Sequence, residues 1–274
     1  MLTEIVNNPK LEKLLISTGN ILNVDNATPL RTSHEELLDS LKLCTDCQAA
    51  AAAATTTTAD GKDDLQLVVI GHSDNEAHVL RAQKELQEKI LENQRNEISI
   101  GAKLFVNNAS GVGGVQQAVT ALMDILKVDC VDNLVVAYHP HGEAKSDGAD
   151  VNSLKNLWNV LQEFAEKKQI CQLGIADLDS SSLQQLYSDA RVPPTIAQIN
   201  LANCCVVPPE LKEFCTQNDI QLLTHGDPEI LLADNDFTIP GYTVDWVMRY
   251  QVHVRCRGVL TAKGYIVQAT KKDK

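Results

Sequence analysis

The sequence predicts an α/β protein whose strands and helices close into a (β/α)8 TIM-type barrel. Predicted strands and helices alternate from residue 65 onward, and such alternation is typical of a parallel sheet covered by helices. The strands are apolar runs rich in β-branched residues, such as LQLVVIG at 65–71. We count about eight strand–helix units without a break, which favours a closed barrel over an open sheet. We therefore expect one barrel domain over residues 1–274.

The segment before the alternation has its own pattern. Residues 11–24 predict two short extended runs joined by a turn at 18–20. A helix follows, in which Ser33 and Glu36 have the spacing of a capping box. The stretch 48–64, QAAAAAATTTTADGKDD, combines alanines, threonines and acidic ends, so we expect a flexible surface insertion there.

The remaining elements follow from hydrophobic periodicity. Residues 74–97 predict one long amphipathic helix, and the segment 243–251 also predicts a helix. The last two segments, 253–260 and 264–270, predict extended structure. The other predicted strands lie at 98–106, 132–140, 170–176, 197–202 and 220–224.

Charge and composition exclude several classes of function. The formal net charge is −12, which argues against nucleic-acid binding because phosphates attract a basic face. No apolar run approaches the ~18 residues of a membrane span. The N-terminus lacks the basic end and apolar block of a signal peptide. We therefore expect a cytoplasmic protein that binds neither membrane nor nucleic acid.

The motifs that suggest a metal or a phosphate are incomplete. The chain has 8 cysteines, and without a secretory signal we expect reduced thiols. Cys44 and Cys47 have C-x-x-C spacing within a helical pattern, but zinc needs four ligands, so we predict no metal site and do not favour a redox dithiol. The glycine-rich loop at 107–114 matches no phosphate-binding pattern.

Part of the chain resembles the aldo-keto reductases. The stretch LGIADLDSSSLQQL followed by AQINL is similar to their cofactor-side segment. ISIGAKLF resembles the strand that carries their catalytic lysine, with Lys103 in its place, and DNLVVAYHP resembles the strand that carries their histidine. The resemblance covers about residues 65–260 and implies a barrel of the aldo-keto reductase type.

A narrower resemblance covers more of the chain. TGNILN, SHEELLDSL, ADLD…LQQLY, QINLANCCVVPPEL, DIQLLTHGDPEILL and RYQVHVRCRG…KGYIVQA are similar, in this order, to the family of glutamate–cysteine ligase regulatory (modifier) subunits. The resemblance implies a non-catalytic protein that binds the ligase catalytic subunit as a heterodimer. Its implied effect is better use of glutamate and weaker feedback inhibition by glutathione, in the first step of glutathione biosynthesis.

An NADPH-dependent aldo-keto reductase with a rearranged active site is the alternative. Those enzymes protonate the developing alkoxide with a tyrosine placed before the lysine strand, but this chain has no tyrosine before Tyr138. The register implied by the resemblance puts Tyr138 at the histidine position, and a shift by one residue would put His139 there. A buried Lys103 would need a carboxylate partner. We predict no catalytic residue.

Most residues that would contact the cofactor in a reductase are also replaced in this chain. The Ser-Asn pair that holds the cofactor carboxamide in the reductases reads Ala176-Asp177 here, and only Gln198 survives. We therefore predict no bound cofactor. We regard Lys103, Tyr138, His139 and Gln198 as remnants of a reductase site.

The cysteines near the strand ends are candidates for contact with a partner. Cys204 and Cys205 follow a predicted strand at the end where a barrel carries its functional loops. Strand alternation alone would bury one of them and half-expose the other. The regulatory-subunit resemblance makes one of them a candidate for partner contact, including an intersubunit disulfide. Cys256 is a third candidate because Arg255 and Arg257 flank it, and nearby positive charge favours the thiolate.

Overall fold

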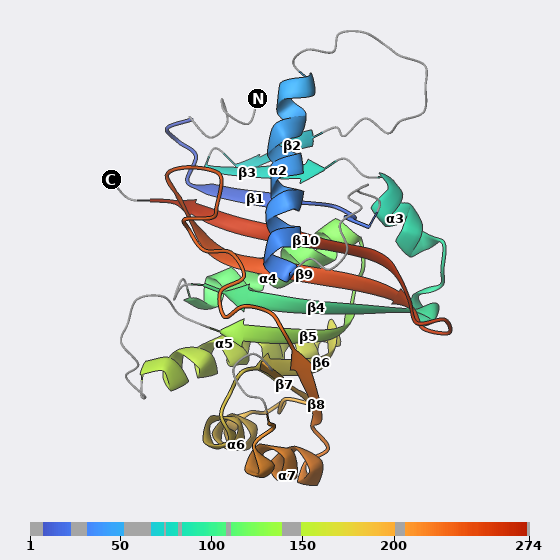
Figure 1. Ribbon diagram of the computed structural model, residues 1–274, viewed down its shortest axis with the longest axis vertical. Helices are drawn as coiled ribbons and strands as arrows, with labels where there is room; N and C mark the ends of the chain where they lie inside the picture. The colour runs from blue at the N-terminus through green and yellow to red at the C-terminus, as the bar shows by residue number, and fades with distance from the viewer. Residues whose placement is uncertain are drawn as a thin grey trace.

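One mixed sheet runs through the described part of the protein. The computed structural model describes residues 8–22, 32–51, 67–73, 75–81, 84–107, 111–138, 149–200 and 206–272. Within these ranges the strand order is β2-β3-β1-β10-β9-β4-β5-β6-β7-β8 (Figure 1). The strands are β1 (Lys13–Ser17), β2 (Leu67–Ser73), β3 (Glu76–Arg81), β4 (Ile98–Val106), β5 (Val131–Tyr138), β6 (Ile170–Ala176), β7 (Ile196–Asn200), β8 (Gln221–His225), β9 (Tyr242–Val254) and β10 (Val259–Lys271).

The segment from β4 to β8 forms the parallel half that the sequence predicts. These strands pair in parallel in chain order, and a helix connects each to the next. Because β4 and β5 are buried on both faces, they appear in the sequence as nearly continuous apolar runs. The helices of the protein are α2 (Ser33–Ala51), α3 (Lys84–Leu91), the short 3-10 helix η1 (Arg95–Glu97), α4 (Gly111–Leu126), α5 (Ala149–Glu166), α6 (Ser180–Asp189) and α7 (Pro209–Gln217).

Two helix predictions are wrong. The segment 243–251 lies in β9, which forms an antiparallel hairpin with β10 and also pairs with β4. Its apolar side chains are buried on both faces of the sheet, so the sequence shows no alternation that would reveal a strand. The predicted helix at 74–97 begins instead with β3, where buried Ala77 and Val79 alternate with more exposed neighbours. Among the described residues of that segment, α3 and η1 are the helical parts.

The α/β class is confirmed, but the sheet does not close into the predicted barrel within the described residues. Strands β2 and β8 form its two edges. Helices α4 to α7 pack on one face, and α2 crosses the other face in front of β10 and β9 (Figure 1). Leu37 and Leu41 of α2 are fully buried on the face that would line the lumen of a barrel.

Two apolar cores therefore lie on opposite sides of one sheet. We call the core under α4 to α7 the outer core and the core under α2 the inner core. Helix α2 extends to Ala51, and residues 52–64 of the predicted flexible insertion lie outside the described residues. None of the helices in the described ranges is long and apolar enough to cross a membrane.

Candidate functional site

Lys103 lies at the centre of a buried cluster of charged side chains on the inner face of the sheet. Strand alternation places Lys103 and Phe105 of β4 on this face, and Lys103 is only 4% exposed. Its Nζ lies 2.9 Å from Oδ2 of Asp227, which lies in the loop after β8. This carboxylate is the partner that a buried ammonium group requires.

Asp227 accepts hydrogen bonds on both carboxylate oxygens. Oδ2 accepts from Lys103 and from Nη2 of Arg249 at 3.0 Å, while Oδ1 accepts from Nη1 of Arg249 and from Oγ of Ser33 at 2.8 Å. Burial alone would raise the pKa of Asp227, but the hydrogen bonds and charge of Arg249, together with Lys103, hold that pKa well below its usual range. Burial lowers the pKa of Lys103, and Asp227 partly offsets this.

A second set of contacts ties α2 to the same face. Glu36 of α2 accepts a hydrogen bond from the hydroxyl of Tyr265 at 2.5 Å and forms an ion pair with Lys263 at 2.6 Å. Burial raises the pKa of Tyr265, and the hydrogen bond to Glu36 raises it further. Helix α2 thus contributes Ser33 and Glu36 to a polar network with β9 and β10.

The helix start differs by one residue from the predicted capping box. Thr32 and Glu35 form the reciprocal pair: the Thr32 backbone N–H donates to Oε2 of Glu35 at 2.9 Å, and the Glu35 N–H donates to Oγ1 of Thr32 at 3.3 Å. Ser33 and Glu36 point instead toward the sheet. In the sequence, both Thr32 with Glu35 and Ser33 with Glu36 have the spacing of a capping box. Because Ser33 and Glu36 contact the sheet, Thr32 and Glu35 cap the helix.

The Asp177 carboxylate, where the reductases hold the cofactor carboxamide, is engaged within the protein. Its Oδ1 accepts from the backbone N–H of Asn200 at 2.9 Å and contacts Nε2 of His225 at 3.0 Å. The backbone N–H of Asp227 donates to Nδ1 of His225 at 3.2 Å, which places the His225 proton on Nε2, toward Asp177. The Asn200 side chain donates to the Asp227 carbonyl at 2.7 Å. These bonds join the ends of β6, β7 and β8.

The structure separates the predicted remnants of a reductase site. Tyr138 packs against the outer core, on the face opposite to Lys103, so it cannot act beside this lysine. Gln198 pairs with Ala176 and lies on the inner face, and its buried Oε1 accepts no hydrogen bond from the described residues. His139 lies outside the described residues.

The sequence did not reveal Asp227 and Arg249 as partners of Lys103. The sequence pattern predicts a helix at 243–251, so it does not indicate that Arg249 lies beside Lys103 on a neighbouring strand. Asp227 lies two residues beyond the carboxyl end of β8. Parallel sheets carry functional side chains at this end of their strands, so its place in the sequence could have indicated Asp227 as a site residue.

The three cysteine candidates are only partly described. Cys204 and Cys205 lie outside the described residues. Cys256 is exposed in the turn between β9 and β10. The Arg255 side chain contacts the Asp132 carboxylate and the Ile98 carbonyl, so it is directed toward β4 and β5.

Within the described residues, the groups at this cluster do not fit the phosphates of a nicotinamide dinucleotide. Asp227 accepts four hydrogen bonds from protein groups beneath α2, and one of them comes from Lys103. A pocket of about 520 Å³ lies at the ends of β6 and β7, but its charged lining residues are acidic: Asp177, Asp179 and Glu210. Such a lining repels the phosphates of the cofactor. Within the described residues no group of three or more His, Cys, Asp or Glu side chains is placed to hold a metal ion.

Comparisons with known proteins show which family the chain resembles. The model of the aldo/keto reductase family matches residues 73–226. The glutamate–cysteine ligase regulatory subunit of Bos taurus is 38% identical over 198 residues, which cover 68% of this chain and 71% of that protein. The Homo sapiens protein of the same name is 37% identical over the same shares. A solved aldo-keto reductase of the silkworm, Bombyx mori, is 19% identical over 52% of this chain and 44% of that chain, with a TM-score of 0.40.

The order of the matched motifs, the identity to these relatives and the family model give one result. The chain belongs to the aldo/keto reductase family and, within it, to the glutamate–cysteine ligase regulatory subunits.

Proposed function

We propose that this protein is a non-catalytic regulatory subunit that binds the catalytic subunit of glutamate–cysteine ligase as a heterodimer in the cytoplasm. In this proposal it improves the use of glutamate and relieves feedback inhibition by glutathione. The names of the relatives support the partner. The state of Lys103 supports the absence of catalysis, because its ammonium group is held by Asp227 under helix α2.

A reductase requires a proton donor within hydrogen-bond reach of the reacting oxygen. Tyr138 lies on the opposite face of the sheet from Lys103. Within the described residues, Lys103 bonds to Asp227 and lies over the ring of Phe105, and neither of these side chains offers an acidic proton to a substrate. This arrangement favours the regulatory function over the alternative of a rearranged reductase.

The proposed effect on the ligase is allosteric. A partner changes an enzyme's affinity for its substrate only if it binds two conformations of that enzyme with different affinity. In this proposal the protein binds more tightly to the ligase conformation that holds glutamate well and glutathione poorly.

The test mixes the purified protein with the ligase catalytic subunit. We expect the two to co-elute in size-exclusion chromatography, and the glutamate KM to fall while the inhibition constant of glutathione rises. Separate elution together with unchanged kinetics would refute the proposal. Titration of the protein alone with NADPH, followed by fluorescence, tests the alternative, since saturable quenching would favour a reductase.

We also propose that Cys204, Cys205 or Cys256 lies in the contact with the catalytic subunit and forms an intersubunit disulfide. Serine variants of each, examined as complexes on non-reducing gels, identify the thiol. The covalent link is expected to disappear in one variant. A link that persists in all three variants and in the triple variant excludes these cysteines.

A further inference from the structure

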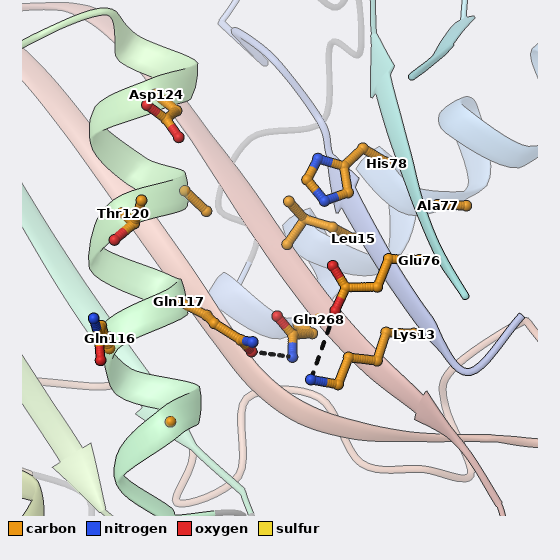
Figure 2. Close-up of a pocket in the computed structure, with 12 residues that line it drawn as sticks. Lys13, Leu15, Glu76, Ala77, His78, Gln116, Gln117, Thr120, Asp124 and Gln268 are labelled. Atoms are coloured by element: carbon orange, nitrogen blue, oxygen red, sulfur yellow. Dashed lines mark hydrogen bonds and ion pairs between the residues drawn. The ribbon is translucent and has the colours of Figure 1, made fainter. Parts of the chain in front are cut away.

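A groove separates helix α4 from strands β1 and β3 on the outer face of the sheet. We call it the α4 groove; it is bounded by Gln117 and Asp124 of α4 on one side and by Lys13 and Glu76 of the strands on the other (Figure 2). Its volume is about 500 Å³, within the range of roughly 300–1,000 Å³ that small-molecule sites occupy. The groove lies on the opposite side of the sheet from Lys103 and plays no part in the proposed function.

The floor of the groove carries a buried carboxamide. Gln268 of β10 is only 8% exposed, and its β-sheet neighbours Leu15 and Trp246 are apolar. Its Nε2 donates to Oε1 of Gln117 at 3.1 Å. Burying a carboxamide costs free energy unless its polar atoms find partners, so an apolar residue would suit this place better if the groove only had to be filled.

This pair of carboxamides offers further hydrogen bonds to a ligand. Each carboxamide has two N–H donors and an oxygen with two lone pairs. Within the described residues, the bond between Gln268 and Gln117 uses one donor and one lone pair. An acceptor on Gln268 and donors on Gln117 therefore stand side by side, and together they complement the C=O and N–H of a peptide group.

Opposite charges stand toward the two ends of the groove. Lys13 lies on the Gln268 side and forms an ion pair with Glu76, in which its Nζ is 3.7 Å from Oε1 (Figure 2). This distance is longer than a hydrogen bond, so within the described residues the N–H bonds of Lys13 remain open to another acceptor. Asp124 lies at the other end of the groove, two helical turns beyond Gln117 (Figure 2). Seven residues of α-helix span about 10 Å. An extended peptide of three residues spans about the same length.

We propose that the α4 groove binds a short peptide with free termini, about three residues long. The peptide carboxylate pairs with Lys13, its ammonium group pairs with Asp124, and the peptide group next to the carboxylate bonds to the carboxamides of Gln117 and Gln268. This order of charges fixes the direction of the peptide along α4. Thr120, on the same face of the helix between Gln117 and Asp124, adds a hydroxyl to this wall.

The first test is calorimetric titration of the full chain with trialanine. We expect saturable binding, weakened roughly tenfold when the peptide is acetylated at its N-terminus or amidated at its C-terminus, because each change removes a hydrogen bond between charged groups. Alanine alone is expected to bind more weakly than trialanine, since it cannot reach both charges. Absence of binding, or equal binding of free and blocked peptides, overturns the proposal.

The second test assigns each peptide end to its residue. Asp124→Asn should weaken trialanine binding roughly tenfold and abolish the difference between trialanine and its N-acetyl form. Lys13→Gln should also weaken trialanine binding roughly tenfold, and it should abolish the difference between trialanine and its C-amidated form. Asp129→Asn and Lys167→Gln make the same chemical changes at exposed positions outside the groove, and they should leave binding unchanged. If Asp124→Asn still binds N-acetylated trialanine more weakly than trialanine, or Lys13→Gln still binds the C-amidated form more weakly, the assigned direction of the peptide is wrong.

Discussion

Arg249 and Asp227 form a two-pronged ion pair beneath helix α2: Nη1 of Arg249 bonds to Oδ1 of Asp227, and Nη2 bonds to Oδ2 at 3.0 Å. The same carboxylate also holds Lys103 at 2.9 Å. One buried carboxylate therefore pairs with two cations, Lys103 of β4 and Arg249 of β9. Lys103, which the sequence resemblance places at the position of the reductases' catalytic lysine, lies buried on the face of the sheet that carries the inner core.

The first prediction concerns Asp227. Asp227→Ala leaves Lys103 and Arg249 buried without their carboxylate, and removing one partner of a buried ion pair costs about 3–5 kcal/mol. Urea denaturation followed by circular dichroism measures the free energy of unfolding. Asp129→Asn, at an exposed site, serves as the control. A loss below about 1 kcal/mol would mean that the cluster is solvated in solution.

The second prediction concerns Lys103→Met, which tests whether Lys103 stabilises the fold or takes part in regulating the ligase. Asp227 keeps its bonds from Arg249 and Ser33, so we expect a smaller loss of stability, about 1–3 kcal/mol. In the complex with the ligase catalytic subunit, the variant should still lower the glutamate KM. Loss of that effect in a folded variant would give Lys103 a direct part in regulation.

The third prediction concerns pH and Asp179, the N-cap of α6. Burial would raise its pKa, but hydrogen bonds from Ser181 and Ser182 outweigh burial and lower the pKa to about 2. The pKa of an unfolded aspartate is about 3.9. The stabilisation that ionisation of Asp179 provides is therefore present above pH ~4 and is lost as the pH falls toward 2.

The variants of Asp179 test this assignment. Asp179→Ala should cost about 1 kcal/mol at neutral pH because the cap is lost. Asp179→Asn retains an acceptor for the Ser182 N–H but cannot ionise, so its stability relative to the wild type should rise as the pH falls. Titration of the Asp179 carboxyl by NMR gives the pKa directly. A midpoint near 4 would contradict the capping bonds.

The fourth prediction concerns Gly264 of β10. A methyl group at this position would collide with the Gly19 carbonyl and with the Tyr250 hydroxyl, which donates to that same carbonyl at 2.8 Å. Neither group can move without breaking the bond between them. We therefore expect Gly264→Ala to cost about 3 kcal/mol, at the upper end of the effect of overpacking. Gly226→Ala meets no atom within 4 Å and should change stability little.

Thermal unfolding of both glycine variants checks this expectation. Equal melting temperatures for Gly264→Ala and Gly226→Ala would show that the N-terminal turn at Gly19 yields to the added methyl group. A selective loss in Gly264→Ala would establish that this turn packs tightly against β10.

How much the sequence predicts depends on the range of the interactions involved. The strands β4 to β8 and their helices were predictable because buried strands and amphipathic helices leave local patterns. Strand β9 was not, since burial on both faces removes the alternation. The capping box lies one residue before the predicted one, because Ser33 and Glu36 contact strands that lie more than two hundred residues away in the chain.

The sequence by itself determined the α/β class, the family and the lack of a tyrosine ahead of the lysine strand, because each of these depends on residues read in order along the chain. Only the tertiary structure decided that Asp227 and Arg249 enclose Lys103, that Tyr138 faces the other core, and that α2 covers the face that would line a lumen. The partners of a buried charge come from strands distant in sequence. Their pairing depends on sheet order and register, which local periodicity does not encode.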